Sequence, residues 1–232
     1  MPQENGPAVV LVSGGLDSSV LLHHVVRNLR RGLVHVLSFN YGQRHSKELD
    51  CARTQVERSG AATHRVIDIS FVGGLLKEGS ALLEGGAPVP DLTAIEKDDL
   101  TQPPTYVPNR NMMLLSMAAA YAEAHGVIDL YYGAQAQDEY GYWDCTEAFL
   151  DRINHVLALN RREPVTVHAP FVRMKKSELV RLGLALGVDF ALTWSCYRGG
   201  ERACGACPTC VERLNAFRQA GAVDPLPYGG TD

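Results

Sequence analysis

The chain has 232 residues, of which 46% are hydrophobic and 21% charged, and its formal net charge is −4. A chain of this length can bury a full core in one domain, and its acidic balance disfavours a broad nucleic-acid interface, which needs clustered lysine and arginine. No apolar run reaches transmembrane length and the N-terminus carries no signal core, so we expect a cytoplasmic protein that acts on a small molecule, without nucleic-acid or membrane partners.

The first element is an apolar stretch, residues 9–12, followed by a glycine turn and the beginning of a helix. Glycine permits a positive φ and close backbone approach, and the free N–H groups of a helix start favour an anion, so the turn is expected to bind phosphate. It lacks the lysine and the four-residue spacer of a Walker A motif. The alternative to a phosphate site is an ordinary strand–turn–helix in which the two glycines are incidental and a serine caps the helix. The expected phosphate-binding residues are Ser13, Gly14, Gly15, Leu16, Asp17, Ser18 and Ser19.

The hydrophobic periodicity beyond this turn predicts alternating strands and helices. This alternation indicates a doubly wound parallel α/β sheet with ligands at the carboxyl ends of its strands, where the glycine turn would lie. Residues 70–108, with many glycines and prolines and an acidic patch at Glu96, Asp98 and Asp99, are expected to form a lid or binding element. The expected strands are residues 33–39, 64–69, 127–132 and 165–168, and the expected helices are residues 18–31, 46–59, 109–125, 144–160 and 175–186.

Four closely spaced cysteines near the end of the chain are Cys196, Cys204, Cys207 and Cys210. Cytoplasmic thiols stay reduced, and two successive C-x2-C steps let side chains converge on one ion, so the set predicts a structural, tetrahedral Zn²⁺ site. An iron–sulfur cluster and a thioredoxin-like redox pair are the alternatives. We expect residues 1–190 to form the nucleotide-binding α/β domain and residues 191–232 to form a zinc-binding segment packed on it.

The other two cysteines differ in their surroundings. Asp144 and Glu147 have the spacing of a capping box, which would place Cys145 in the first turn of a helix, where the dipole favours the thiolate. A catalytic role for Cys145 is therefore open, and the alternative is a cysteine packed beside Trp143. Cys51 lies inside an earlier predicted helix with no charged motif around it and is expected to be a buried thiol.

Several segments together resemble one family, the 7-cyano-7-deazaguanine synthases (QueC) of the queuosine pathway, within the PP-loop ATP pyrophosphatases. The resemblance covers nearly the whole chain, about residues 8–217, with the segments in family order. It implies an adenine nucleotide alpha hydrolase-like (HUP) fold and a C–N-forming ligase. The matching segments are residues 13–18, 39–45, 106–111 and 141–145, and the cysteine run from 196 to 210 with the Glu-Arg pair after it.

The resemblance implies that ATP adenylates the carboxylate of 7-carboxy-7-deazaguanine, that ammonia displaces AMP to give the amide, and that a second adenylation dehydrates the amide to the nitrile, preQ0. Mg²⁺ would accompany the nucleotide, and a homodimer is expected. Such chemistry needs positioning and charge stabilisation, which the glycine turn, Arg110 and Lys176 can supply. Asp17 would hold Mg²⁺ near the phosphates or cap the helix, so the expected catalytic residues are Asp17, Arg110 and Lys176. Asp144 or Asp138 would accept paired hydrogen bonds from the purine edge. The expected substrate-binding residues are Gln43, Arg44, Asp138, Tyr142, Asp144 and Cys145.

The chain departs from the family pattern at three positions. Trp143 replaces a common proline, Thr146 a common arginine and Asn109 a common glycine. These departures leave open a divergent deazaguanine amide ligase that stops at the amide or uses another amine. A tRNA thiolase of the same superfamily is a second alternative, but such an enzyme should be basic and carry an RNA-binding appendage. A third alternative is a non-catalytic nucleotide-binding or zinc-ribbon module, which would leave the arginine and lysine segments unexplained. For Lys176, the alternative to a catalytic role is a lysine that is exposed to solvent at the end of a helix.

Overall fold

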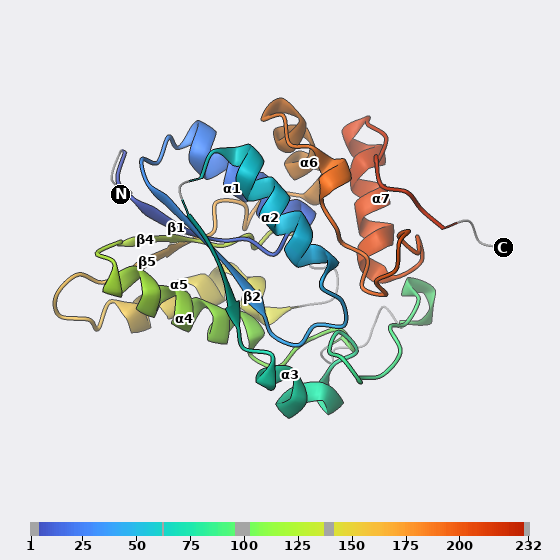
Figure 1. Ribbon diagram of the computed structural model, residues 1–232, viewed down its shortest axis with the longest axis horizontal. Helices are drawn as coiled ribbons and strands as arrows, with labels where there is room; N and C mark the ends of the chain where they lie inside the picture. Colours follow the sequence, from blue (N-terminus) through green and yellow to red (C-terminus); the bar gives the residue numbers. More distant parts are fainter. Residues whose placement is uncertain (1–4, 62, 96–102, 137–141, 230–232) are drawn as a thin grey trace.

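The computed structural model describes residues 5–61, 63–95, 103–136 and 142–229, and its centre is a five-stranded parallel sheet (Figure 1). The strands are β1 (Ala8–Leu11), β2 (Val34–Asn40), β3 (Thr63–Asp68), β4 (Asp129–Tyr131) and β5 (Thr166–His168). Their order is β3-β2-β1-β4-β5, so the chain winds outward in both directions from β1. This order confirms the predicted doubly wound α/β fold.

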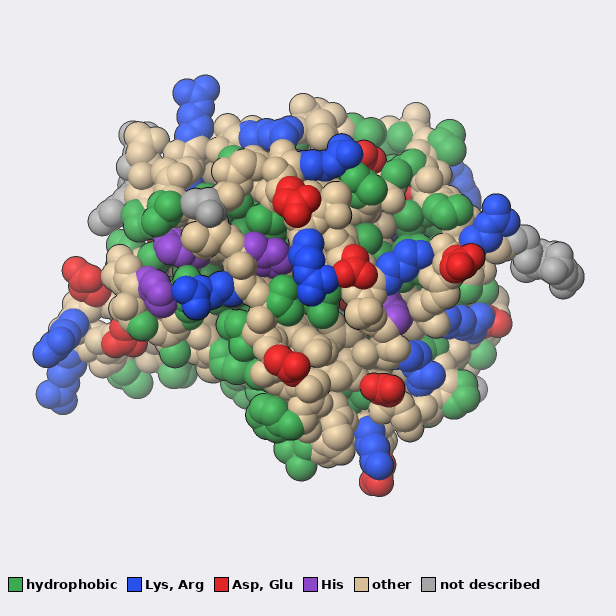
Figure 2. Space-filling model, viewed as in Figure 1, with side chains coloured by type: hydrophobic (Ala, Val, Ile, Leu, Met, Phe, Trp, Pro, Cys, Tyr) green, Lys and Arg blue, Asp and Glu red, His purple; other side chains and the backbone are tan. Residues whose placement is uncertain are grey.

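Helices cover both faces of the sheet. They are α1 (Leu16–His23), α2 (Lys47–Ser59), α3 (Phe71–Leu76), α4 (Arg110–Ala124), α5 (Glu147–Leu157), α6 (Lys176–Ala185) and α7 (Pro208–Ala220). Helices α1, α2 and α6 lie on one face, α4 and α5 lie on the other, and α7 packs on α6 (Figure 1). Within the described ranges, no helix is long and apolar enough to span a membrane. Over the face in view, lysine and arginine are interspersed with aspartate and glutamate (Figure 2).

The central strand β1 shows why both faces need helices. Val9 packs into the core beneath α4 and α5, whereas its neighbour Val10 packs into the core beneath α1 and α6. Both side chains are fully buried. A strand buried on both faces has a continuous apolar sequence, which is the pattern of residues 9–12.

Helix α2 forms as its sequence predicts. Ser46 is its N-cap, and Gly60 ends it in the left-handed conformation at φ +81°. Its buried side chains include Leu49, Ala52 and Val56, which recur at helical spacing and face the core.

Two helix predictions need correction. The expected helix start at Asp144 is wrong, because Trp143–Cys145 form a separate 3-10 turn and Thr146 caps α5 by accepting a hydrogen bond from the Phe149 amide at 3.2 Å. Cys145 therefore lies before α5 and not in its first turn. The first helix is α-helical only to His23 and continues as a π-helical turn over His24–Asn28.

The predicted lid or binding element, residues 70–108, begins with α3 and then folds back over the loop that follows β2. Gln43 and Leu83 form an isolated antiparallel bridge, and the Arg44 amide donates to the Leu82 oxygen at 3.0 Å. The described part of this segment therefore pairs with the loop that follows the carboxyl end of β2. The acidic patch at residues 96–99 lies outside the described residues.

Candidate active site

A cavity of about 300 Å³ opens at the carboxyl ends of β1, β2 and β4. Val12 after β1, Tyr41 after β2 and Gly133 after β4 line it. The strand order reverses between β1 and β4, where the loops of a doubly wound sheet diverge and leave a crevice for ligands. The cavity thus lies where the sequence predicts a ligand.

The glycine turn joins β1 to α1 and forms one wall of the cavity. Gly14 has φ +91°, and a β-carbon there would lie 1.9 Å from the backbone oxygen of Glu48, so only glycine fits. Gly15 is the N-cap of α1, and the hydroxyl oxygens of Ser13 and Ser18 lie 3.1 Å apart and brace the turn. The first N–H groups of α1 have no partner within the helix by position, which is the arrangement that binds phosphate.

A lysine and two carboxylates stand beside this turn. Lys176, the first residue of α6, places Nζ 2.7 Å from Glu212 Oε2 on α7 and 3.8 Å from Asp17 Oδ2 on α1. Burial raises the pKa of the Asp17 carboxyl above its ordinary value, and the Lys176 ammonium opposes that rise. The structure therefore brings the predicted Asp17 and Lys176 together. Glu212 had no local sequence signal beyond its place after the cysteine run.

Another part of the cavity lining is built around Arg110, at the start of α4. Its Nη1 atom donates to Tyr41 Oη at 3.4 Å, and the guanidinium carbon lies 5.7 Å from the centre of the Tyr41 ring. Asn109 precedes it in the left-handed conformation at φ 53°, which asparagine tolerates better than most residues. The departure from glycine at this position thus keeps the backbone conformation.

Glu48 also lines the cavity and was not predicted from the sequence. Burial raises the pKa of its carboxyl to about 7, although the positive charge of Arg110 opposes the rise. A carboxyl of this kind in a cavity is a candidate functional group.

The predicted substrate residues fall into two groups. Gln43 and Arg44 line the cavity, but Gln43 accepts from the Tyr41 amide at 2.8 Å, and Arg44 donates to the Ala87 oxygen at 2.7 Å. These two side chains hold the loop after β2 in place. Tyr142 and Cys145 also line the cavity, and the Tyr142 hydroxyl hydrogen-bonds to Thr105.

Asp144 is not among the residues that line the cavity. Its side chain is buried, and Oδ2 accepts from the Asn111 amide at 3.3 Å while Asn111 Nδ2 donates to the Asp144 backbone oxygen at 3.3 Å. The carboxylate therefore fixes the start of α4 beside Arg110. The other predicted purine-binding carboxylate, Asp138, lies outside the described residues.

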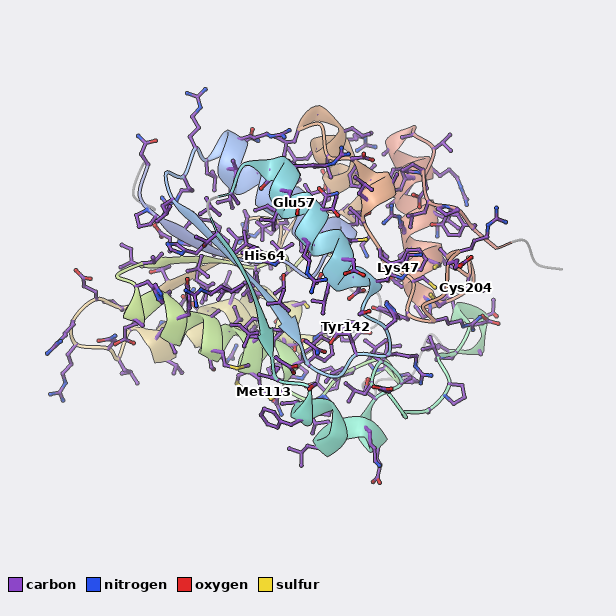
Figure 3. All side chains as sticks on the ribbon, in the orientation of Figure 1. Lys47, Glu57, His64, Met113, Tyr142 and Cys204 are labelled. Atoms are coloured by element: carbon purple, nitrogen blue, oxygen red, sulfur yellow. The ribbon has the colours of Figure 1, made fainter. Side chains whose placement is uncertain are left out.

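The four predicted metal ligands converge at the start of α7. The Sγ atoms of Cys196, Cys204, Cys207 and Cys210 all lie within 4.8 Å of one another. The Cys204 amide donates to Cys196 Sγ at 3.4 Å and the Cys207 amide to Cys204 Sγ at 3.3 Å, as is favourable for thiolate ligands. Four thiols at this spacing fit a tetrahedral zinc ion. Figure 3 shows Cys204 near the start of α7.

A phosphate-binding glycine turn at the switch point of a parallel sheet, with a lysine and two carboxylates beside it, defines a nucleotide-utilising enzyme of the PP-loop type. A model of the family described as "Queuosine biosynthesis protein QueC" matches residues 7–221. The chain therefore belongs to the QueC family, and the resemblance drawn from its motifs is confirmed.

Two relatives that are similar in sequence over nearly the whole chain carry the same name. The chain is 45% identical over 230 residues to a 7-cyano-7-deazaguanine synthase of Chromohalobacter salexigens, covering 99% of this chain and 88% of the relative. It is 47% identical over 221 residues to a 7-cyano-7-deazaguanine synthase of Hahella chejuensis, covering 95% and 92%. Among solved structures, NMN synthetase from Francisella tularensis superposes with a TM-score of 0.47 at 15% identity, over 83% of this chain and 66% of that one.

Proposed function

We propose that the protein converts 7-carboxy-7-deazaguanine and ammonia into 7-cyano-7-deazaguanine through an amide intermediate, with an ATP-dependent adenylation before each step. Membership of the QueC family and the names of its relatives support this reaction. The observation that carries the proposal is a single cavity lined by the phosphate turn, Lys176 and Arg110. Joining a carboxylate to AMP brings two anions together, and these positive groups offset their repulsion.

The turn from Ser13 to Ser19 would hold the β- and γ-phosphates, and Lys176 would neutralise charge at the α-phosphate. Asp17 and Glu212 would hold Mg²⁺, which prefers carboxylate oxygens. The Asp17 Oδ1 atom supports this role, because it is buried without a hydrogen-bond partner in the described chain. When bound, the ion neutralises phosphate charge and orients the nucleotide.

Arg110 would bind the substrate carboxylate through paired hydrogen bonds, in an orientation fixed by Tyr41 and by the Asp144 contact to α4. Tyr142 offers an aromatic surface for the deazapurine ring. Cys145 lies beside this surface, where Asn111 Nδ2 donates to its Sγ at 3.4 Å, and would contact the same ring.

We further propose that the four cysteines bind Zn²⁺ in a structural role and that residues 191–232 act as a zinc-binding segment on the α/β domain of residues 1–190. All four ligand positions of a tetrahedral ion would be filled by protein, which leaves no open position for chemistry. The ion would fix the start of α7, from which Thr209 and Glu212 reach the cavity lining.

Mass spectrometry of the purified protein with ATP, ammonium and 7-carboxy-7-deazaguanine tests the reaction. The expected products are the nitrile, AMP and pyrophosphate. Accumulation of the amide alone would identify an amide ligase instead, which the Trp143 departure leaves open. ADP as the stoichiometric product would refute adenylation, because phosphate would then be transferred in place of AMP.

A further inference from the structure

The cavity contains a carboxylate that the proposed steps leave without a role. Asp17, Glu48 and Glu212 are the carboxylate side chains among its described lining residues. Asp17 and Glu212 flank Lys176. Within the described chain, no ion pair and no hydrogen bond involves the Glu48 carboxyl group, so its oxygens are available to a ligand.

The position of Glu48 is fixed from two sides. It is the second residue of α2, and its backbone oxygen packs against Gly14 in the phosphate turn. Its charge also interacts with Arg110, the residue proposed to hold the substrate carboxylate. Glu48 therefore lies close to both groups that would hold the two reacting anions, and so near the place where the acyl–AMP bond would form and break.

The surroundings of Glu48 suit proton transfer. Its charge interacts with Arg110, Tyr41, Cys51 and Cys196, of which only Arg110 is a cation at neutral pH. Burial raises its pKa to about 7, so both protonation states are accessible under physiological conditions. A carboxylate with these properties can bind a small cation and take a proton from it.

We infer that the Glu48 carboxylate binds the ammonium ion and accepts its proton beside the activated carboxyl carbon. This inference rests on the proposed amide-forming step. In solution near neutral pH the nitrogen source is almost entirely ammonium, which has no lone pair for attack. Glu48 would therefore convert the abundant, unreactive form into the nucleophile inside the cavity.

The step balances in atoms and charge. An N–H bond of ammonium breaks, its electron pair stays on nitrogen, and the proton passes to the Glu48 carboxylate. The lone pair of ammonia then forms the C–N bond, and the C–O bond to AMP breaks with its electrons leaving on the phosphate. The nitrogen loses its second proton to the departing AMP phosphate, which leaves the neutral amide.

Glu48→Gln tests the inference, since glutamine keeps the size of the side chain but cannot accept the proton. Exchange of pyrophosphate into ATP, dependent on 7-carboxy-7-deazaguanine, should persist, because adenylation precedes ammonia. Amide formation from ammonium should fall by about 100-fold or more. Hydroxylamine, which is unprotonated at neutral pH, should react with the acyl-adenylate at nearly the wild-type rate.

Glu57→Gln is the matched control, because Glu57 is an exposed glutamate on the same helix (Figure 3). It should leave every rate unchanged. In Glu48→Gln, the residual rate should follow the concentration of free ammonia as the pH rises. Glu48→Asp should regain part of the ammonium-dependent rate, and a melting curve would show that each variant is folded.

Three results would overturn the inference. They are a wild-type ammonium-dependent rate in Glu48→Gln, a loss of pyrophosphate exchange in the folded variant, or failure of hydroxylamine to react. An absence of substrate-dependent exchange in the wild-type protein is a different outcome, since it would remove the proposed function itself.

Discussion

Replacing Gly14 with alanine should damage both the fold and the nucleotide site. The left-handed conformation costs a non-glycine residue about 1–2 kcal/mol. The new β-carbon would also lie 1.9 Å from the Glu48 backbone oxygen and 2.7 Å from the Ala52 nitrogen, so α2 must move. Such overpacking costs about 1–3 kcal/mol more. The total of about 2–5 kcal/mol corresponds to a fall in Tm of roughly 4–20 °C for a chain of this size.

Gly60→Ala separates the two causes. Gly60 has a similar φ of +81°, but a β-carbon there would meet nothing within 4 Å. The control should therefore lose only the conformational part, about 1–2 kcal/mol, and should keep its affinity for ATP. Thermal unfolding with and without ATP is the assay, because ATP at about 100 times its Kd should stabilise a binding-competent protein by about 2.7 kcal/mol.

The ATP-dependent shift should be present in Gly60→Ala and absent in Gly14→Ala. The two positions share the backbone conformation and differ in the contact with α2, so a difference between the variants reports on that contact. Equal unfolding temperatures together with an equal ATP shift would refute the packing of α2 on the phosphate turn.

Asp17→Asn should abolish turnover while the melting curve stays close to wild type, and full activity would refute the PP-loop assignment. Burial raises the pKa of Glu48 from 4.5 to about 7, so the unfolded chain loses this proton at a lower pH than the folded chain does. The free energy of unfolding therefore falls as the pH rises through that interval. Glu48→Gln should thus match the wild-type Tm below pH 4.5 and exceed it above pH 7, and equal values at both ends would contradict the burial. Cys207→Ser should lower the metal content and Tm, whereas elemental analysis of the wild-type protein showing neither zinc nor iron would refute the metal site.

Local sequence predicts those parts of the fold that depend on neighbouring residues. The periodicity of α2, its serine N-cap and its glycine C-cap are all encoded within one segment, and the helix ends at Ser59 as expected. The glycine turn is likewise a local feature, because the strand, the turn and the helix follow one another in the chain.

The start of α5 shows where local reasoning fails. Asp144 and Thr146 are both suitable helix caps, and their own segment does not decide between them. Asn111, 33 residues earlier in the chain, donates its backbone amide to the Asp144 carboxylate. Because Asp144 is engaged in this contact, Thr146 caps the helix instead. The contact between Asp144 and the purine was also predicted from the neighbouring residues alone, and it stays a prediction.

The sequence did not predict Glu48 and Glu212 as site residues, because the groups that each of them contacts come from elements far away in the sequence. In the sequence, Glu48 is one of several charged residues on an amphipathic helix. In the folded chain, α2 packs on the phosphate turn, and Glu48 interacts with Arg110 of α4. Glu212 meets Lys176 only when α7 packs on α6. Neither contact leaves a spacing signal within one segment. The place of Glu212 after the cysteine run is visible in the sequence, but only the folded chain shows which groups the two carboxylates meet.

The cysteine cluster and the nucleotide site share their supporting contacts. The Trp194 amide donates to the Gly14 oxygen at 3.0 Å, and its ring lies under the Lys47 ammonium at 3.6 Å from the ring centre. Lys47 also donates to the Glu201 oxygen, inside the loop between the first two cysteines, at 2.8 Å. Loss of the proposed metal would therefore loosen the glycine turn as well as α7. For this reason substitution of the four cysteines, which take no part in the proposed chemistry, should weaken ATP binding as well as lower the Tm.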